Sequence, residues 1–137
     1  MAASLDALRA AIEKWNAHDP DGYTSYYRPD VALHGFPEGV VDRASLGAFY
    51  ESIWAGLPDA RATLEDAFAS EDRVVARLTV TGTHDGELMG VPPTHRPVRF
   101  DVMTILRFDV DGRVAERWNV TDLLGLLQQI GAVPAPA

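Results

Sequence analysis

Residues 116–122, with the sequence ERWNVTD, contain two carboxylates that could transfer protons. They lie between a hairpin signal at Asp111-Gly112 and an apolar run that begins at Leu123. If residues 113–121 form a strand, alternate side chains share a face. One face then carries Glu116, Trp118, Val120 and Asp122. Carboxylates beside apolar side chains predict acid–base chemistry in an apolar pocket.

Asp122 has two interpretations, and the sequence leaves both open. As a general acid or base it would lie at a pocket, where apolar surroundings penalise the charged form of a carboxyl group and make it a better proton acceptor. As a helix N-cap it would accept backbone N–H bonds from the apolar run that follows, and such bonds favour the charged form.

Three other polar residues could support a proton transfer. Glu116 is either a second proton-transfer group or a residue at the sheet edge that pairs with an arginine. His34 and His84 each lie near the end of a strand, where open pockets collect polar groups. Either histidine could bind a substrate carbonyl or orient an acid, although a lone histidine is more often structural.

Substrate contacts are expected mainly from large side chains. Trp118 and Val120 would form pocket wall or core. Tyr50 and Trp54 belong to an amphipathic helix, and their polar tips could reach a pocket. Arg77 alternates with valine and leucine in a strand, so it faces either solvent or a polar pocket, depending on what covers that side of the sheet.

Composition limits the partners. The net charge is −8 and the basic residues are scattered, which argues against nucleic acid and anionic membranes. The longest apolar runs fall far short of the roughly 20 residues of a membrane span. The N-terminus lacks the long apolar core of a signal peptide, so a cytoplasmic protein is expected.

Several catalytic devices are missing from the sequence. Cysteine is absent, which excludes thiolate chemistry and disulfides. The four histidines form no HxH or HExxH pair, so no metal site is expected. The sequence contains no P-loop, glycine-rich dinucleotide turn or nucleophile elbow.

The chain of 137 residues is expected to form a single domain over 1–137, with a flexible tail at 132–137. Hydrophobic periodicity predicts helices at 4–17, 21–28, 43–56 and 122–130, and strands at 31–34, 61–69, 73–84, 97–109 and 113–121. Helices that precede a run of hairpin-connected strands indicate an α+β fold. Helices packed on a strongly curved, mostly antiparallel sheet would form a cone with a pocket.

Residues 82–100 and 107–131 resemble the SnoaL-like polyketide cyclases, or ester cyclases, most specifically in E-x-W-x-x-x-D followed by a leucine-rich helix. The resemblance implies a cone of the nuclear-transport-factor-2-like superfamily and a homo-oligomer, either a dimer or a tetramer. It implies intramolecular aldol ring closure of a small apolar, including polycyclic, carbonyl substrate without metal or cofactor. Asp122 would be the acid/base. One departure is His95, where many relatives carry glycine.

Two other functions remain open from the sequence. Epoxide hydrolases of this fold carry Arg-x-Asp on the third long strand and an aspartate two residues after the last-strand tryptophan. The corresponding residues here are Arg77-Leu78-Thr79 and Trp118-Asn119-Val120, so that triad is disfavoured, whereas an epoxide-opening cyclase with another arrangement is not. The third function is a non-catalytic domain that binds a small apolar molecule.

Overall fold

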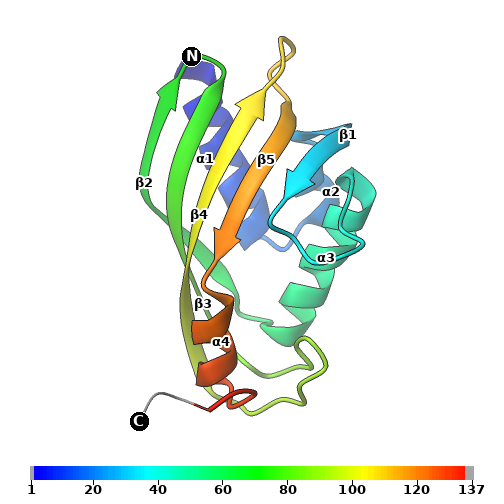
Figure 1. The fold of residues 1–137 in the computed structure, drawn as a ribbon, viewed down its shortest axis with the longest axis vertical. Helices are drawn as coiled ribbons and strands as arrows, with labels where there is room; N and C mark the ends of the chain where they lie inside the picture. Colours follow the sequence, from blue (N-terminus) through cyan, green and yellow to red (C-terminus); the bar gives the residue numbers. More distant parts are fainter. Residues whose placement is uncertain (1, 135–137) are drawn as a thin grey trace.

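The computed structural model describes residues 2–134 of the chain, and the side chains of residues 5–134. In chain order the elements are α1 (Ala2–Asn16), α2 (Pro20–Thr24), β1 (Tyr27–His34), α3 (Arg43–Gly56), β2 (Arg61–Ser70), β3 (Arg73–Thr83), β4 (Pro97–Phe108), β5 (Val114–Thr121) and α4 (Leu123–Gln129) (Figure 1).

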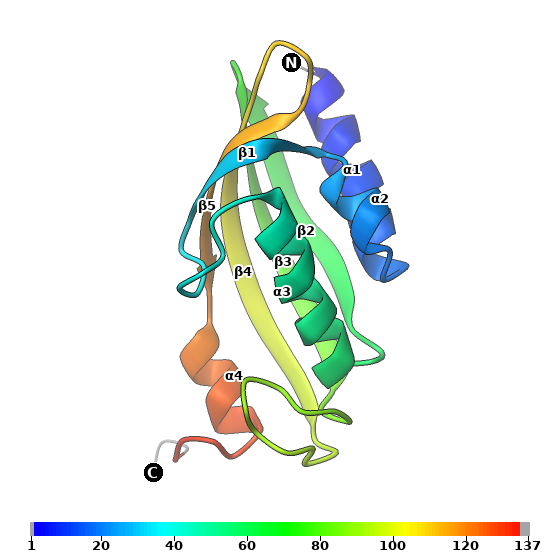
Figure 2. The same cartoon turned by 90° about the vertical axis from the view of Figure 1, so that its right-hand side faces the viewer.

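The strands form one five-stranded sheet in the order β1-β5-β4-β3-β2. Neighbouring strands are antiparallel except for β1 and β5, which are parallel. The sheet is strongly curved, and α1, α2 and α3 lie on its concave side (Figure 2). Helix α4 follows β5 and lies beside the lower part of β4, apart from α1, α2 and α3 in that view. The α+β architecture expected from the sequence is therefore confirmed.

Alternation along the strands directs the apolar side chains towards the helices. In β3 the buried residues Val74, Ala76, Leu78 and Val80 alternate with residues of the other face, which include the exposed Arg73 and Arg77. They pack towards a core that includes Trp15 of α1 and Leu46 and Trp54 of α3. Amphipathic helices thus close the concave side of the sheet.

Helix α3 begins and ends where the sequence predicts. Asp42 caps it: the Asp42 carboxylate accepts a bond from the Ser45 amide at 2.9 Å, and the Ser45 hydroxyl accepts one from the Asp42 amide at 3.0 Å. The two long hairpins, β2–β3 and β4–β5, also agree with the predicted strands to within a residue or two. Local turn and cap signals were sufficient for these elements.

The predicted helix 21–28 is wrong at its C-terminal end. Helix α2 stops at Thr24, and β1 begins at Tyr27, four residues before the predicted strand. Long-range pairing decides this boundary, because the Val114 amide donates to the Tyr26 carbonyl at 3.0 Å and Tyr27 pairs with Val114. Pro29 is tolerated because β1 is an edge strand.

After α4 the chain turns at Gly131, which has φ +78°. The amides of Ala132 and Val133 bond back to the Leu127 carbonyl. Residues 135–137 of the tail lie outside the described residues, so the flexibility expected for 132–137 stays a prediction. In the described part of the chain, no helix is long and apolar enough to cross a membrane.

Candidate active site

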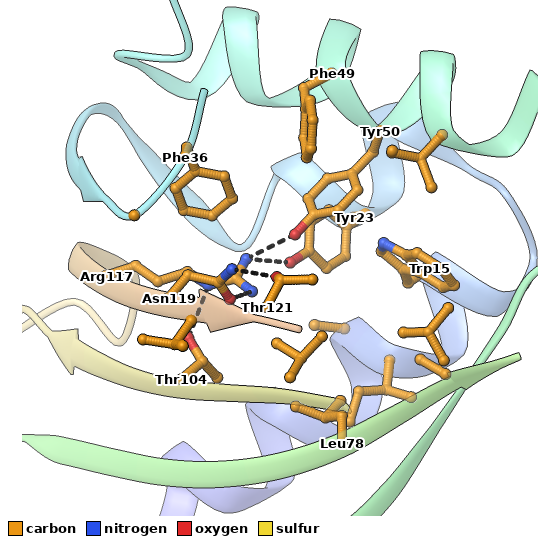
Figure 3. Close-up of a pocket in the computed structure, with 18 of the residues that line it drawn as sticks. Trp15, Tyr23, Phe36, Phe49, Tyr50, Leu78, Thr104, Arg117, Asn119 and Thr121 are labelled. Atoms are coloured by element: carbon orange, nitrogen blue, oxygen red, sulfur yellow. Dashed lines mark hydrogen bonds between the residues drawn. The ribbon is translucent and has the colours of Figure 1, made fainter. Parts of the chain in front are cut away.

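A cavity of about 530 Å³ lies between the concave side of the sheet and the helices (Figure 3). Its walls are mostly aromatic and aliphatic, and they include Trp15, Tyr23, Phe36, Phe49, Tyr50 and Leu78. The described lining contains no aspartate, glutamate or histidine. The size and the apolar walls suit a small molecule with several rings.

Arg117 of β5 is the charged group of this cavity, and its residue is only 5% exposed. Its Nη1 donates to the hydroxyl oxygens of Tyr23 at 3.1 Å, Tyr27 at 2.9 Å and Tyr50 at 3.1 Å. The tyrosines come from α2, β1 and α3 respectively. One guanidinium thus joins three elements at one end of the cavity.

The other donors of Arg117 bond to residues of the sheet. Nε donates to the Thr104 hydroxyl at 2.9 Å, and Nη2 donates to Asn119 Oδ1 at 2.8 Å. Asn119 Nδ2 continues the chain of bonds to the Thr121 hydroxyl at 3.0 Å (Figure 3). The ring of Phe36 lies 5.1 Å from the guanidinium carbon, which is within the range of a cation–π contact.

Two of the phenols around Arg117, those of Tyr23 and Tyr27, are neutral at neutral pH. Burial raises the pKa of Tyr23 and of Tyr27 well above the ordinary range, and Arg117 only partly opposes this effect. A guanidinium stays protonated in proteins. The cluster therefore carries a net positive charge inside an apolar cavity.

The polar residues Arg117, Asn119 and Thr121 are the ones that sequence reasoning missed. Of the four residues predicted to share a strand face, Glu116, Trp118 and Val120 do so, whereas Asp122 lies after the end of β5. At Glu116 and Trp118 that face points away from the cavity, and only Val120 borders it. The reason is register: Leu106 pairs with Arg117, and Thr104 pairs with Asn119. Paired residues share a face, so the buried positions of β4 direct the polar residues of β5 inwards.

Asp122 lies at the rim of the cavity and is exposed. The N-cap interpretation is confirmed, because Asp122 Oδ1 accepts a bond from the Gly125 amide at 3.0 Å. The apolar surroundings expected for this carboxylate are wrong. Its two neighbours, Thr121 and Leu123, line the cavity, whereas Asp122 does not. A catalytic role for Asp122 stays a prediction.

Glu116, His34 and Trp118 form a separate group on the outer face of the sheet. His34 Nε2 donates to Glu116 Oε2 at 2.8 Å, and Arg107 Nε donates to Glu116 Oε1 at 3.2 Å. The bond from His34, followed by Arg107, holds the pKa of Glu116 below its usual range. The His34 ring stacks on the Trp118 ring, with 5.3 Å between the ring centroids. The expected pairing of Glu116 with an arginine is therefore confirmed, and none of the three lines the cavity.

His84 is fully buried, but it also lies outside the cavity lining. Its Nδ1 accepts a bond from the Thr94 amide at 3.2 Å, and its Nε2 is 3.2 Å from the Val91 carbonyl. With Nδ1 as an acceptor, Nε2 carries the proton and donates to that carbonyl. The ring thus holds the loop at 85–96 in place.

The remaining candidates divide between cavity, core and surface. Tyr50 lines the cavity, and its hydroxyl oxygen accepts a hydrogen bond from Arg117. This agrees with the expectation that the polar tip of Tyr50 could reach a pocket. Trp54 is buried and stacks on His18 at 5.2 Å, outside the lining. Arg77 is exposed on the outer face, and Val120 borders the cavity while 71% of the residue is exposed.

Residues 2–134 contain no group of three or more histidine, aspartate or glutamate side chains placed to hold a metal ion. The cavity itself supplies hydrogen-bond donors to an oxygen atom, from Arg117 and the phenols. A side-chain carboxylate that accepts a proton would have to come from the rim, where Asp122 lies.

Comparison with known proteins connects this geometry to a family. The SnoaL-like polyketide cyclase family matches residues 5–130. The chain belongs to this family. It is 28% identical over 134 residues to aklanonic acid methyl ester cyclase AcmA of Streptomyces galilaeus, covering 96% of this chain and 92% of AcmA. It is 29% identical over 126 residues to nogalonic acid methyl ester cyclase of Streptomyces nogalater, covering 89% of this chain and 90% of the relative.

Two solved structures agree with the fold. AclR of Streptomyces galilaeus, a proposed hydroxylase, superposes with a TM-score of 0.90 at 34% identity, covering 100% of this chain and 86% of AclR. IdmH of Streptomyces antibioticus, a proposed polyketide cyclase, gives 0.80 at 31% identity, covering 93% of this chain and 98% of IdmH.

Proposed function

We propose that this chain is a cofactor-independent cyclase that closes a ring by an intramolecular aldol reaction on an apolar carbonyl substrate. The observation that carries the proposal is the apolar cavity of about 530 Å³ in a member of the SnoaL-like family. A flexible polyketide held there would have its two reacting carbons brought together. Such positioning can supply much of the acceleration of an intramolecular reaction.

Asp122 is the proposed acid/base. Its carboxylate takes a proton from the carbon beside one carbonyl, and the resulting enolate carbon attacks a second carbonyl of the same molecule. A carbon–carbon bond forms, and the alkoxide takes up a proton, so the product is an isomer of the substrate. The position of Asp122 between the cavity-lining residues Thr121 and Leu123 supports this role.

The test separates catalysis from capping with two substitutions of Asp122. Asparagine caps a helix about as well as aspartate but cannot accept the proton, whereas alanine does neither. Asp122→Asn should keep the melting temperature and lower the rate of ring closure by about 10²–10⁴-fold. Asp122→Ala should lower both the rate and, by about 1 kcal/mol, the free energy of unfolding.

Suitable substrates are aklanonic acid methyl ester and nogalonic acid methyl ester, after which two relatives are named. Chromatography would measure the rate of ring closure with the protein and, for comparison, the rate of the uncatalysed reaction. If Asp122→Asn turns over as fast as the unmodified protein, Asp122 is a cap alone.

Hydroxylation is a second candidate, favoured by the 34% identity with AclR over the whole of this chain. Mass spectrometry of the product distinguishes the two reactions. Aldol ring closure leaves the mass unchanged, whereas hydroxylation adds one oxygen atom and requires O2 and a two-electron reductant in the assay. A heavier product from the same substrate would favour hydroxylation over ring closure.

A further inference from the structure

The buried guanidinium of Arg117 has no anionic partner in the described chain. No carboxylate lies within ion-pair distance of it. All its hydrogen-bond acceptors are neutral, namely the side chains of Tyr23, Tyr27, Tyr50, Thr104 and Asn119. Burying a charge without a counter-ion is costly, and neutral acceptors offset only part of that cost.

The acids nearest in sequence do not reduce this charge from within the cavity. Glu116 is on the outer face of β5, where it is already bonded to His34 and Arg107. The phenols cannot supply the missing negative charge either, since burial keeps Tyr23 and Tyr27 protonated. Among residues 5–134, therefore, no side chain compensates the positive charge in the cavity.

Hydrogen-bond counting shows donors left over beside this charge. A guanidinium Nη carries two hydrogens, and Nη2 of Arg117 uses one on Asn119. Tyr50 accepts from Arg117, and its own hydroxyl hydrogen has no acceptor among the described residues. Tyr50 and Arg117 both line the cavity. Two unused donors and a positive charge thus belong to two residues that bond each other and line the same apolar cavity.

We propose that Arg117 and Tyr50 form an anion-binding subsite for a flat apolar ligand that carries one ionised oxygen group. The oxygen belongs to a carboxylate, or to a phenolate or enolate of an acidic polyketide ring. Apolar walls bind the ring system, and the subsite binds its charge. This inference deepens the proposed function, because it states the charge of the substrate held in the same cavity.

Matched pairs of probes test the subsite by isothermal titration calorimetry at pH 7. The carboxylate pair is 2-naphthoate and methyl 2-naphthoate, and the enolate pair is 2-hydroxy-1,4-naphthoquinone and 2-methoxy-1,4-naphthoquinone. The ionised member of at least one pair should bind about tenfold more tightly or better than its neutral partner. The pair that shows the larger ratio identifies the oxygen group. Equal binding within both pairs, or no binding of any probe, overturns the proposal.

Asn119→Asp is the decisive variant, because it gives Arg117 an internal counter-ion. The new carboxylate would lie where Asn119 Oδ1 accepts from Nη2 at 2.8 Å. The Thr121 hydroxyl can reverse its bond and donate to the second carboxylate oxygen. The variant is nearly isosteric and should fold, as circular dichroism would check. Its preference for the ionised probe should disappear, and a preference that persists overturns the proposal.

Arg77→Met is the matched control for net charge, since Arg77 is an exposed arginine on the outer face of the same sheet. Arg77→Met should still bind the ionised probe more tightly than the neutral probe, to the same degree as the unmodified protein. If this preference were lost, it would come from long-range attraction by the net charge, and the proposed subsite would be wrong. The binding measurement needs no turnover. Ring closure that depends on Asp122 without any charge preference overturns the subsite alone. A charge preference without ring closure overturns the proposed function alone.

Discussion

Two buried polar side chains, His84 and Arg117, differ in how fully their hydrogen-bonding groups are paired. His84 has both ring nitrogens occupied by the loop that it holds, with Thr94 on one side and Val91 on the other. Arg117 still has a donor and an uncompensated charge after bonding its neighbours. A satisfied buried group stabilises the fold, whereas an unsatisfied one is costly unless a ligand completes it. Arg117 is therefore expected to bind a ligand, whereas His84 is expected to stabilise the fold.

His84→Ala is expected to destabilise the protein by about 2–4 kcal/mol, because it leaves a void and removes the ring nitrogens that bond the Thr94 amide and the Val91 carbonyl. Urea denaturation measures the change. His95→Ala is the control, since His95 belongs to the same loop and is exposed, and it should cost no more than about 0.5 kcal/mol. If folded His84→Ala lost ring closure while its stability was unchanged, His84 would act on the substrate after all.

At the residue scale, the sequence predicted which side chains share a strand face better than it predicted which face is buried. Alternation placed Glu116, Trp118 and Val120 together, and the apolar run after Asp122 indicated the N-cap as one of two interpretations of that residue. Alternation alone does not show which of the two faces is buried. Polarity favours the face of Trp118, because tryptophan is more apolar than arginine, but Arg117 is the residue that lines the cavity. That decision depends on pairing with β4, through contacts such as Leu106 with Arg117. A one-residue change of register exchanges the two faces of a strand.

At the element scale, regions with strong local signals were predictable. Helix α3 has a capping box and a regular apolar stripe, and the hairpins have short turns. The segment 25–34 lacks such signals. Residues 27–34 of it form a strand because β1 pairs in parallel with β5, about 85 residues later in the chain. Non-local pairing of this kind leaves little trace in a local pattern.

Two glycines in the loop between β1 and α3 test how closely that loop approaches the sheet. Both have positive φ, +85° at Gly35 and +93° at Gly39. A Cβ at Gly35 would lie 1.8 Å from the Asn119 carbonyl oxygen, whereas a Cβ at Gly39 would meet nothing within 4 Å. Gly39→Ala should therefore cost about 1 kcal/mol, from backbone strain alone.

Gly35→Ala should cost about 1–3 kcal/mol more than Gly39→Ala, since β5 must shift to admit the methyl group. Chemical denaturation of the two variants isolates the difference. The shift would also move Asn119 in the cavity, so binding of an apolar probe should weaken only in Gly35→Ala. Equal stability of the two variants would mean that the loop yields instead of the sheet.

At the scale of the whole molecule, the two sides of the sheet differ. Helices cover the concave side, and the outer side carries a row of side chains that crosses all five strands in register. The row consists of His34, Trp118, Ile105, Val75 and Phe68. Phe68 is 58% exposed and Ile105 is 36% exposed. Contiguous apolar surface of this kind indicates an interaction site.

The charges beside this row favour a second copy of the chain as the partner. On one side Glu116, Arg107 and Arg73 occupy paired positions, and on the other Asp66 pairs with Arg77. Each flank thus contains both signs, so a two-fold packing of the face against itself need not bring only like charges together. We propose that the protein is a homodimer through this face.

Ile105→Glu tests the dimer, because it places a charge in the middle of the row while its side chain points away from the cavity. The unmodified protein should sediment as a dimer at micromolar concentration, and the variant should sediment as a monomer, since an unpaired charge in an apolar interface is costly. Val110→Glu is the control: Val110 is fully exposed in the turn between β4 and β5, so the same charge added there should leave the dimer intact. Because the cavity is on the other side of the sheet, monomeric Ile105→Glu should still bind the naphthoate probe. A dimer that survives in this variant would place the contact between subunits on another surface.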